Sequence, residues 1–512
     1  MKLYSSILFV MAAAGAVAAA SSCSSDSASA GCGHRLVILH TNDTHSHIDP
    51  LPDNDMGGVA RRKVLIDSVR AAEPNVLLVD AGDIVQGTLY FHLYKGEVEQ
   101  RMLNELGYDV QILGNHEFDN GMSALAVMDS MASPALIATN YDLSGSSIGR
   151  YYQPYIVKEY DGRKVGVFSV NLNPAGMVAE GNYDGVKYLD WRSVTDATVK
   201  HLREQEGADA VIAVTHIGYE SSGESEGLFG DEDLARQTSG IDVIIGGHSH
   251  TKLPENLRLV NAAGDSVLVV QTGKYGQYLG EVTLDLDRLT ATSRLIPVDS
   301  RLDARRDPEL MSVIEPYRAG VDSLYSHEVA RVSARAGALN SKSVRLMNLA
   351  ADCVADRGRR LAGGVQFAIT NKGGLRTTWK PGALTEGAAI DMMPFANKVV
   401  VIDLKGADLM DALKVMAARG GDAVSRELDV TFDLLSGALI DARLDGRAID
   451  PDATYRLATI DYLAKGGDYM TPFTRGTQVA ESRRVAYDDL IEYLKANPVV
   501  NPDATERMLP ED

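Results

Sequence analysis

Cysteine is scarce in this chain, with three residues among 512. Cys23 and Cys32 lie in the N-terminal segment, and Cys353 lies in a stretch with helical spacing of its apolar residues. This placement gives no disulfide framework, and we expect Cys353 to be a small buried residue. Hydrophobic cores must hold the fold instead. A chain of this length with 45% hydrophobic residues can form two or three of them.

Positive charge is also in deficit. Lysine and arginine number 50 against 70 aspartate and glutamate residues, which gives a formal net charge of -20. This balance argues against a nucleic-acid polymer as a partner, because phosphate backbones require a basic surface. A small anionic substrate is not excluded, since bound divalent cations would reverse the local charge. Nothing in the sequence indicates an obligate protein partner.

Long apolar runs are missing as well. Residues 7–20 form an uncharged run of 14 residues, which is too short to span a bilayer but typical of a signal peptide. A Ser/Ala-rich tether follows up to residue 33. The tract AAASSC resembles a bacterial lipobox, which would make Cys23 the lipidated first residue of an outer-membrane lipoprotein facing the periplasm or the exterior. Ala20 stands where leucine is more usual, so an ordinary secretory signal is the alternative. Both readings predict export.

Seven residues of metal-ligand type each follow a short apolar run. They are Asp43 and His45 in LHTNDTH, Asp83 in AGD, Asn115 in GNHEFD, His216 in AVTH, and His248 and His250 in GGHSH. A lone histidine at a strand end is usually an ordinary polar residue, but that reading does not explain the ordered set. Carboxylate, amide and imidazole ligands together suit Zn²⁺, Mn²⁺, Fe²⁺ or Co²⁺. Two such cations stabilise the attacking and leaving oxygens of a phosphoryl displacement, so we predict a two-metal phosphohydrolase.

The apolar runs of the first half alternate with stretches of helical spacing, such as residues 57–73. This pattern predicts an α/β layered domain with its site beyond the strand ends. The sequence pattern changes near residue 300, where helical spacing of the apolar residues predicts a linking helix. We expect a signal peptide and tether at 1–33, a metal-bearing domain at 34–300, a linker helix at 301–326 and a substrate-binding domain at 327–512.

The motifs D-x-H, G-D-x-x-x-G, G-N-H-E-F-D, T-H and G-H-x-H, in this order, resemble those of the calcineurin-like metallophosphoesterases. The second half narrows the resemblance to the 5′-nucleotidases, over about residues 34–500. The resemblance implies an α/β fold, namely a four-layer αββα sandwich joined by a helix to a smaller α/β substrate-binding domain. It implies that Asp43, His45 and His250 hold one metal, that Asn115, His216 and His248 hold the other, and that Asp83 bridges both.

His116 directly follows the expected ligand Asn115. The resemblance makes His116 the residue that faces the scissile phosphate, with Asp119 orienting and charging its ring. An imidazolium there could stabilise transition-state charge or protonate the leaving alkoxide. The alternative is that His116 is a further metal ligand.

Six residues of the second half are candidates for substrate binding. They are Asn371, Gly374 and Arg376 in TNKGGLR, Phe395 in MPFAN, and Tyr462 and Asp468 in DYLAKGGD. The resemblance implies that Arg376 meets the phosphate or ribose, that Phe395 and Tyr462 sandwich the base, and that Asp468 binds the ribose hydroxyls. Each stacked ring is worth about 1–3 kcal/mol and tolerates any base.

Three features depart from the family pattern. Tyr462 stands where phenylalanine is commoner, and Tyr469 follows GGD where glycine is commoner. The loop before the helical stretch near 344 looks shortened, and Arg345 is a candidate for a second phosphate-binding arginine. These departures leave the exact substrate open.

The resulting prediction is an exported enzyme that hydrolyses nucleoside 5′-monophosphates, and UDP-sugars as a further class, to nucleoside and phosphate. One alternative is a 2′,3′-cyclic-nucleotide 2′-phosphodiesterase with 3′-nucleotidase activity. The other is a non-catalytic surface lipoprotein that binds nucleotides, against which the intact ligand set argues. The expected cofactors are two divalent metal ions, and the expected partners are a nucleotide or nucleotide sugar and, through the lipid, a membrane.

Overall fold

The computed structural model describes residues 34–220, 229–341 and 343–511. The expected signal peptide, tether and Cys23 lie outside the described residues. Among the residues described, no helix combines the length and the apolar character that a membrane crossing needs.

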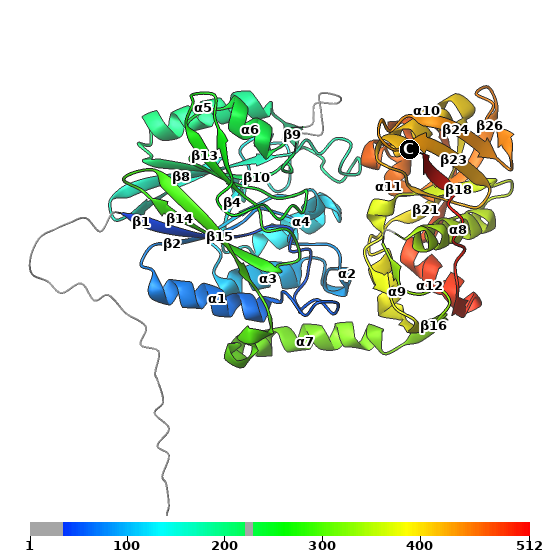
Figure 1. The fold of residues 1–512 in the computed structure, drawn as a ribbon, viewed down its shortest axis with the longest axis horizontal. Coiled ribbons are helices and arrows are strands. Elements are labelled where there is room, and N and C mark those ends of the chain that lie inside the picture. The colour runs from blue at the N-terminus through cyan, green and yellow to red at the C-terminus, as the bar shows by residue number, and fades with distance from the viewer. Residues whose placement is uncertain (1–33, 221–228, 342, 512) are drawn as a thin grey trace, which may run out of the picture. The chain divides into compact units, whose positions relative to one another are not determined.

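Two sheets form the centre of the first domain (Figure 1). The seven-stranded sheet has the order β15 (Thr290–Pro297), β14 (Tyr278–Asp285), β1 (Arg35–Thr41), β2 (Val76–Asp80), β3 (Val110–Ile112), β4 (Ala135–Ile137) and β6 (Tyr152–Gln153). The six-stranded sheet has the order β12 (Arg258–Val260), β13 (Ser266–Val270), β11 (Val243–Ile245), β10 (Ala210–His216), β8 (Arg163–Asn171) and β7 (Tyr155–Tyr160). Strands β1 to β3 run parallel, as do β8, β10, β11 and β13.

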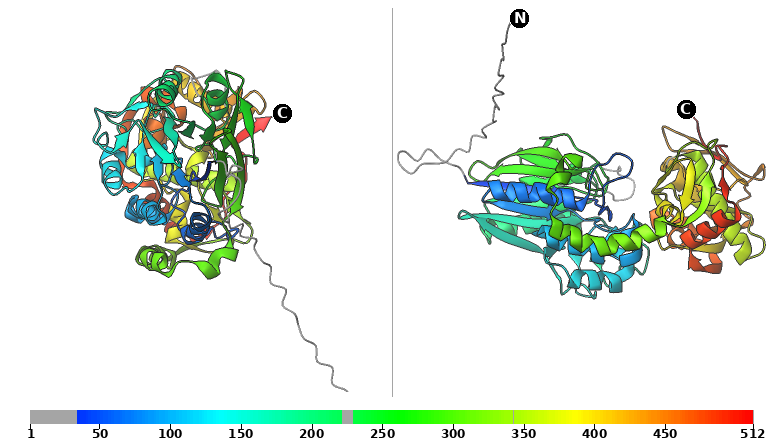
Figure 2. Two further views of the ribbon diagram at one scale, coloured as in Figure 1. Left: turned by 90° about the vertical axis from the view of Figure 1, so that its left-hand side faces the viewer. Right: turned by 90° about the horizontal axis from the view of Figure 1, so that it is seen from below.

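The two sheets pack face to face because successive side chains of a strand point to opposite faces. In β1, Leu36 and Ile38 belong to the apolar core that the two sheets share, whereas Val37 and Leu39 belong to an outer core. Helices α1 (Val59–Ala72), α3 (Glu97–Leu106) and α4 (Gly121–Ser130) lie on one outer face, and α5 (Trp191–Glu204) and α6 (Asp231–Gln237) lie on the other (Figures 1 and 2). The predicted four-layer αββα sandwich is therefore confirmed.

The predicted alternation of strand and helix is interrupted between β4 and β8, and it ends after β11. Strands β12 and β13 pair antiparallel, and so do β14 and β15, with no helix between the members of either pair. The segment YLGEVTLD forms β14, which lies in the seven-stranded sheet between β1 and the edge strand β15. Short elements complete this half: α2 (Leu89–Tyr94), the 3-10 helix η1 (His116–Phe118), and the pair β5 (Tyr141–Asp142) and β9 (Lys187–Tyr188).

A long helix follows this domain. A 3-10 turn, η2 (Ser300–Arg305), comes first, and α7 (Pro308–Tyr325) follows it. The side chain of Asp307 accepts the backbone N–H of Glu309 at 2.9 Å, and Pro308 occupies the first turn, where its missing N–H is not needed. The predicted linking helix therefore forms, with its start fixed by this cap.

The second half is a separate α/β domain. Its main sheet has the order β22 (Ala423–Val424), β18 (Phe367–Thr370), β26 (Thr454–Ile460), β21 (Lys398–Lys405) and β27 (Thr477–Val485). A second sheet has the order β25 (Arg447–Ala448), β24 (Leu439–Leu444), β23 (Leu428–Asp433) and β29 (Met508–Glu511), and it contains the hairpin β23–β24. Smaller sheets join β20 (Gly382–Thr385), β16 (Glu328–Val332) and β28 (Val499–Val500), and β17 (Leu339–Asn340) with β19 (Thr378–Trp379).

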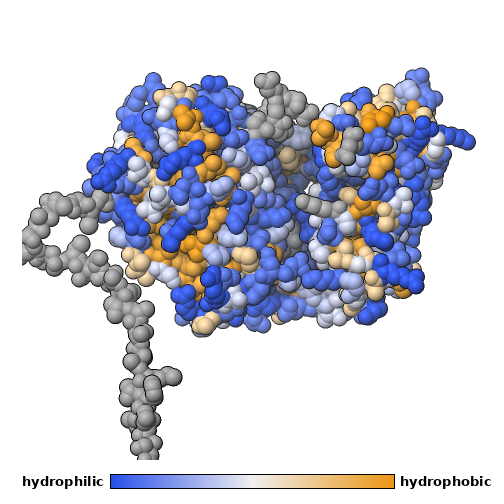
Figure 3. Space-filling view, in the orientation of Figure 1, coloured by the Kyte–Doolittle hydropathy of each residue, from blue (hydrophilic) through white to orange (hydrophobic). Residues whose placement is uncertain are grey.

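Helices cover these sheets. They are α8 (Val344–Leu361), α9 (Glu386–Met392), α10 (Gly406–Ala418), α11 (Asp461–Ala464) and α12 (Ala486–Ala496), with short 3-10 turns η3 (Lys372–Gly374), η4 (Gly467–Tyr469) and η5 (Thr471–Arg475). Cys353 is buried on α8, as predicted. Hydrophilic and hydrophobic residues are interspersed over the face shown in Figure 3.

Candidate active site

The residues of metal-ligand type converge because of the sheet topology. Asp43, Asp83 and Asn115 follow the parallel neighbours β1, β2 and β3, while His216 ends β10 and His248 follows its parallel neighbour β11. The carboxyl ends of neighbouring parallel strands share one edge of a sheet, where open α/β sheets form their sites. Two sheets that pack face to face thus bring both sets of strand ends together.

The backbone at these positions is strained. Positive φ angles occur at Asp43 (51°), His45 (46°), Asp83 (55°), His248 (81°) and His250 (56°). Asp and His tolerate this region better than most residues, but each such position still costs of the order of 1–3 kcal/mol. Five of the seven predicted ligands thus lie at strained positions, which are common at functional sites.

Two glycines allow the close approach of these loops. At Gly82, with φ 84°, an added Cβ would lie 2.7 Å from the backbone nitrogen of Gly114. At Gly247, an added Cβ would lie 2.9 Å from Nδ1 of His216. The glycines of AGD and GGHSH therefore permit the close approach of these loops at Gly82 and Gly247.

The first group of ligand atoms comprises Asp43, His45 and His250, which lie within 4.8 Å of one another. Nε2 of His45 lies 2.9 Å from Nε2 of His250, and the latter lies 3.5 Å from Oδ1 of Asp43. Nδ1 of His45 lies 3.2 Å from the carbonyl oxygen of Val85, to which we assign its proton. The lone pair of His45 Nε2 then points towards a second imidazole and a carboxylate, an arrangement that suits a cation.

The second group comprises Asp83, His216 and His248. Nδ1 of His216 donates to the carbonyl of Ala81 at 2.8 Å, which leaves Nε2 as the lone-pair atom of the neutral ring. This buried Nε2 has no hydrogen-bond partner among the described residues, and it lies 3.1 Å from Oδ2 of Asp83. The amide oxygen of Asn115 lies 2.9 Å from Nδ1 of His248, which adds the fourth predicted member.

Asp83 lies between the two groups. Its Oδ2 is 3.1 Å from His216 Nε2 and 3.9 Å from His45 Nε2. Burial opposes a charge on His216, yet the nearby carboxylate of Asp83 raises the pKa of His216 to about 10. The site thus stabilises positive charge between these atoms, and the donor set fits two divalent cations that share one carboxylate.

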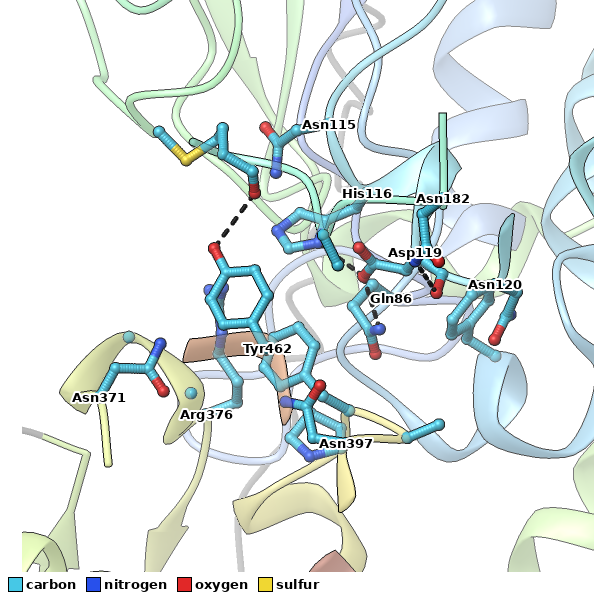
Figure 4. A pocket seen from close by; sticks show the side chains of 18 of the residues that line it. Gln86, Asn115, His116, Asp119, Asn120, Asn182, Asn371, Arg376, Asn397 and Tyr462 are labelled. Atoms are coloured by element: carbon cyan, nitrogen blue, oxygen red, sulfur yellow. Dashed lines mark hydrogen bonds and ion pairs between the residues drawn. The ribbon is translucent and has the colours of Figure 1, made fainter. Parts of the chain in front are cut away.

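His116 and Asp119 form a pair beside these groups (Figure 4). Nδ1 of His116 lies 2.8 Å from Oδ2 of Asp119, which also accepts a hydrogen bond from Nε2 of Gln86 at 2.7 Å. Burial works against protonation of His116, but the charges of Asp119 and Asp83 raise its pKa above the ordinary value. His116 also lies within ligand distance of His45 and Asp83, as the alternative reading requires.

A cavity of about 390 Å³ is lined by residues of both domains. From the first domain it includes Asp83, Asn115, His116, Asp119, His248 and His250, and from the second it includes Asn371, Gly374, Arg376, Phe395, Tyr462 and Asp468. All six predicted substrate residues therefore line the same cavity as the His116 pair. Asp43, His45 and His216 are buried and do not line it.

Two cationic side chains of the cavity lie near one ring. The Phe395 ring centroid is 5.8 Å from that of His116, and the guanidinium carbon of Arg376 is 5.4 Å from the Phe395 centroid. Arg345, the candidate for a second phosphate arginine, instead donates to the carbonyl of Pro502 at 2.6 Å and does not line the cavity.

Asp468 is held by two of the other candidates. Oδ2 of Asp468 accepts from Nδ2 of Asn371 at 2.6 Å, and Oδ1 lies 2.8 Å from the hydroxyl oxygen of Tyr462. Gly374 is close to this network, because an added Cβ would lie 2.9 Å from Oδ1 of Asn371.

Sequence reasoning did not single out Glu117 or Gln86. The buried carboxylate of Glu117 accepts backbone N–H groups from Asp83 at 3.1 Å, from Ile84 at 2.9 Å and also from Gly114. It therefore fixes the loop that carries Asp83. Its place inside GNHEFD was the available signal, but a side chain that binds backbone amides has no sequence signature of its own.

Comparison with known proteins agrees with this fold. The model of the calcineurin-like phosphoesterases matches residues 36–252, and that of the 5′-nucleotidase C-terminal domain matches residues 326–475. The first match defines the class as a metallophosphoesterase. With both domains present in order, the chain belongs to the 5′-nucleotidase family of these enzymes. It is a phosphoric monoester hydrolase with Asp/His clusters able to bind metal ions, and two divalent ions are typical of the family.

The relatives span most of the chain. A 5′-nucleotidase of Vibrio cholerae is 27% identical over 91% of this chain and 91% of its own length. Protein UshA of Yersinia enterocolitica is 28% identical over 85% of this chain and 86% of its own length. The crystal structure of a 5′-nucleotidase precursor from Thermus thermophilus superposes with a TM-score of 0.83 at 29% identity, covering 93% of this chain and 99% of that one. A trifunctional nucleotide phosphoesterase of Bacillus subtilis is 29% identical over 90% of this chain, which spans about a third (34%) of that protein.

Proposed function

We propose that this protein hydrolyses nucleoside 5′-monophosphates to nucleoside and phosphate. The observation that carries the proposal is the shared cavity, in which His116 and the ligand-type residues Asp83, Asn115, His248 and His250 line one wall and the residues suited to a nucleoside line the other. An aromatic ring, a guanidinium and a carboxylate there match a base, a phosphate and a ribose diol.

We assign the metals as the family pattern implies. Asp43, His45 and His250 would hold one ion, Asn115, His216 and His248 the other, and Asp83 both. The short distances between lone-pair atoms within each group support this assignment. Such a pair of ions supplies a water of lowered pKa and neutralises charge on the phosphoryl oxygens.

His116 acts on the phosphate in this proposal. Asp119 accepts the proton of Nδ1 and orients the ring, and the backbone N–H of His116 donates to Asp83 at 2.9 Å, which fixes the start of η1. The protonated ring can stabilise the charge that develops on the phosphoryl group, or give its proton to the leaving 5′-oxygen. Gln86 keeps the Asp119 carboxylate in place.

The second wall selects the nucleoside. Arg376 would bind the phosphate or ribose, Phe395 and Tyr462 would stack on the base, and Asp468, oriented by Asn371, would accept the ribose hydroxyls. We place the boundaries of the metal-bearing domain, linker helix and nucleotide-binding domain at 34–300, 301–326 and 327–512.

A phosphate-release assay with added Mn²⁺ tests the function on AMP, UDP-glucose, 2′,3′-cAMP and 3′-AMP. We expect AMP to be turned over fastest, with loss on chelation and recovery on adding Mn²⁺. Faster turnover of 2′,3′-cAMP and 3′-AMP would replace the proposal with the cyclic-phosphodiesterase activity. If the protein binds its metals but hydrolyses none of these esters, the alternative of a non-catalytic nucleotide-binding protein replaces the proposal.

We also propose export and lipid attachment at Cys23, which the sequence pattern supports. A lipid anchor with several acyl chains binds a membrane stably, whereas one chain does not. Cys23→Ser should move the enzyme from the membrane fraction to the soluble fraction without changing turnover. A mature N-terminus at Ser21 or Ser22 without lipid, found by mass spectrometry, would contradict the proposal and favour an ordinary secretory signal.

A further inference from the structure

The two aromatic departures from the family pattern contact one loop of the other domain. The hydroxyl oxygen of Tyr462 lies 3.1 Å from the carbonyl oxygen of Met177, and the backbone N–H of Tyr469 donates to the carbonyl of Gly176 at 3.2 Å (Figure 4 for Tyr462). The loop is itself a closed turn, because the N–H groups of Met177 and Val178 donate to the carbonyl of Pro174. An added Cβ on Gly176 would lie 3.0 Å from the Tyr469 ring, so the two surfaces are in close contact.

The Tyr462 hydroxyl has one proton and two acceptors for it. One acceptor is the carbonyl of Met177, and the other is Oδ1 of Asp468 at 2.8 Å. A hydroxyl turns about its C–O bond to suit its partners, but it donates one hydrogen bond at a time. The same oxygen accepts the backbone N–H of Asp468 at 3.1 Å, so Tyr462 holds this residue at two points.

The conformation of Asp468 depends on its hydrogen-bond partners. Its backbone has φ 52°, a strained conformation for a residue other than glycine, and its carbonyl accepts from the Arg419 guanidinium. Asn371 occupies one lone pair of Oδ2, and Tyr462 occupies one of Oδ1 when its proton points that way. A ribose hydroxyl that donates to the Oδ1 lone pair used by Tyr462 binds in exchange for the Tyr462 proton.

We propose that the Tyr462 hydroxyl is a positioning group that couples ribose binding to the contact between the two domains. The proposal rests on the proposed binding of a nucleoside at Asp468. A ribose hydroxyl that donates to Oδ1 of Asp468 competes with the Tyr462 proton, which then turns to the carbonyl of Met177. Occupancy of the nucleoside wall thereby strengthens a contact with the 174–178 loop of the metal-bearing domain. By linkage, that domain contact strengthens nucleoside binding to the same extent.

The coupling is absent if residue 462 is phenylalanine. The ring would still stack on a base, but neither Asp468 nor Met177 would have the hydroxyl as a partner. Tyr462→Phe therefore separates stacking from coupling. Tyr155→Phe is a matched control, because it removes a hydroxyl that donates to Glu206 at 3.0 Å and belongs to a residue outside the cavity lining.

The experiment measures amide exchange in the full chain, with and without adenosine. In Tyr462→Phe, the amide of Asp468 loses its acceptor and should exchange about fivefold faster, as expected for one net hydrogen bond. Adenosine should slow exchange of the Asp468 and Tyr469 amides in the wild type and in Tyr155→Phe, and should not slow it in Tyr462→Phe. Isothermal titration checks that adenosine still binds this variant.

Kinetics give a second readout that a merely structural role would not produce. Tyr462→Phe should lower KM about fivefold for AMP, because the ribose no longer has to displace the Tyr462 proton from the charged Asp468 carboxylate, and should leave KM for 2′,3′-dideoxy-AMP unchanged. Equal adenosine protection in the wild type and Tyr462→Phe, or equal KM changes for both nucleotides, would overturn the coupling. Failure of the proposed function would look different. The wild type would then not hydrolyse AMP, but the Asp468 amide would still exchange faster in Tyr462→Phe than in the wild type without adenosine.

Discussion

The two walls of the cavity are built on different principles. The side chain of Asp83 on the metal-binding wall and those of Asp43 and His216 behind it are 0–2% exposed, and the two aspartates lie on left-handed backbone. On the nucleotide wall, the Asp468 side chain is 26% exposed, and its orientation depends on neighbouring side chains. One wall is fixed by the fold before any ligand arrives, whereas the other is set by contacts that water can replace.

This difference predicts how each wall responds to substitution. A buried ligand that is lost leaves other charged groups without a partner, and such losses are severe. A half-exposed contact that is lost is partly replaced by solvent, so the effect is smaller and falls on substrate affinity. Four substitutions test this contrast, from the largest expected effect to the smallest.

Asp83→Ala should have the largest effect. The Asp83 carboxylate faces imidazole nitrogens of both ligand groups, so its removal should abolish turnover and release most of both metals. His250→Ala is the matched control within the same wall. It belongs to one group only and should mainly weaken one metal. Metal analysis that finds a full pair of ions in Asp83→Ala would refute the bridging assignment.

His116→Ala should separate chemistry from metal binding. The variant should keep both metals and bind nucleotide, while turnover falls by roughly 10²–10⁴, the usual contribution of a positioned proton-transfer group. This loss corresponds to about 3–5.5 kcal/mol of barrier. Single-turnover kinetics with metal analysis provide the measurement. If instead the variant loses a metal in proportion to its activity, His116 is a further ligand.

The contrast also explains what could be predicted from the sequence. Strand-end residues such as Asp43, Asp83 and His216 were predictable, because an apolar run followed by a ligand type fixes both the element and the edge at which it ends. The pairing of strands into two stacked sheets was available only through the family resemblance. The α/β character of the second domain was predicted, but its small sheets join strands of two to five residues with no periodic signal.

Side chains that act on the backbone or across domains escaped prediction. Glu117 binds amides of the Asp83 loop, and the Tyr462 hydroxyl contacts Met177, 285 residues away in the chain. Arg345 was a candidate on sequence proximity to the family's phosphate arginine, yet its guanidinium is engaged by the carbonyl of Pro502. Spacing along the chain carries no information on such long-range partners.

Glu117→Gln should weaken the metal-binding wall without removing a ligand. One glutamine oxygen cannot accept all three amides that Glu117 now accepts, and its NH₂ group would face a backbone donor. We expect metal affinity to fall about 10–100-fold, as is usual when a partner of a ligand is lost. Competition with a chelating dye measures it. Turnover at saturating Mn²⁺ should largely recover, and a variant that stays inactive at high Mn²⁺ would place Glu117 in the chemistry itself.

Arg376→Lys should have the smallest effect, because it changes one half-exposed contact on the nucleotide wall. Lysine keeps the charge but loses the planar guanidinium that lies 5.4 Å from the Phe395 ring centroid. A cation–π contact near the surface is worth about 0.5–1 kcal/mol, so KM for AMP should rise about two- to fivefold at nearly constant kcat. Arg345→Lys is the control, since Arg345 lies outside the cavity lining and its substitution should leave KM unchanged. A fall of kcat in Arg376→Lys as large as that expected for His116→Ala would break the distinction between the walls, because it would place a catalytic contribution on the nucleotide wall.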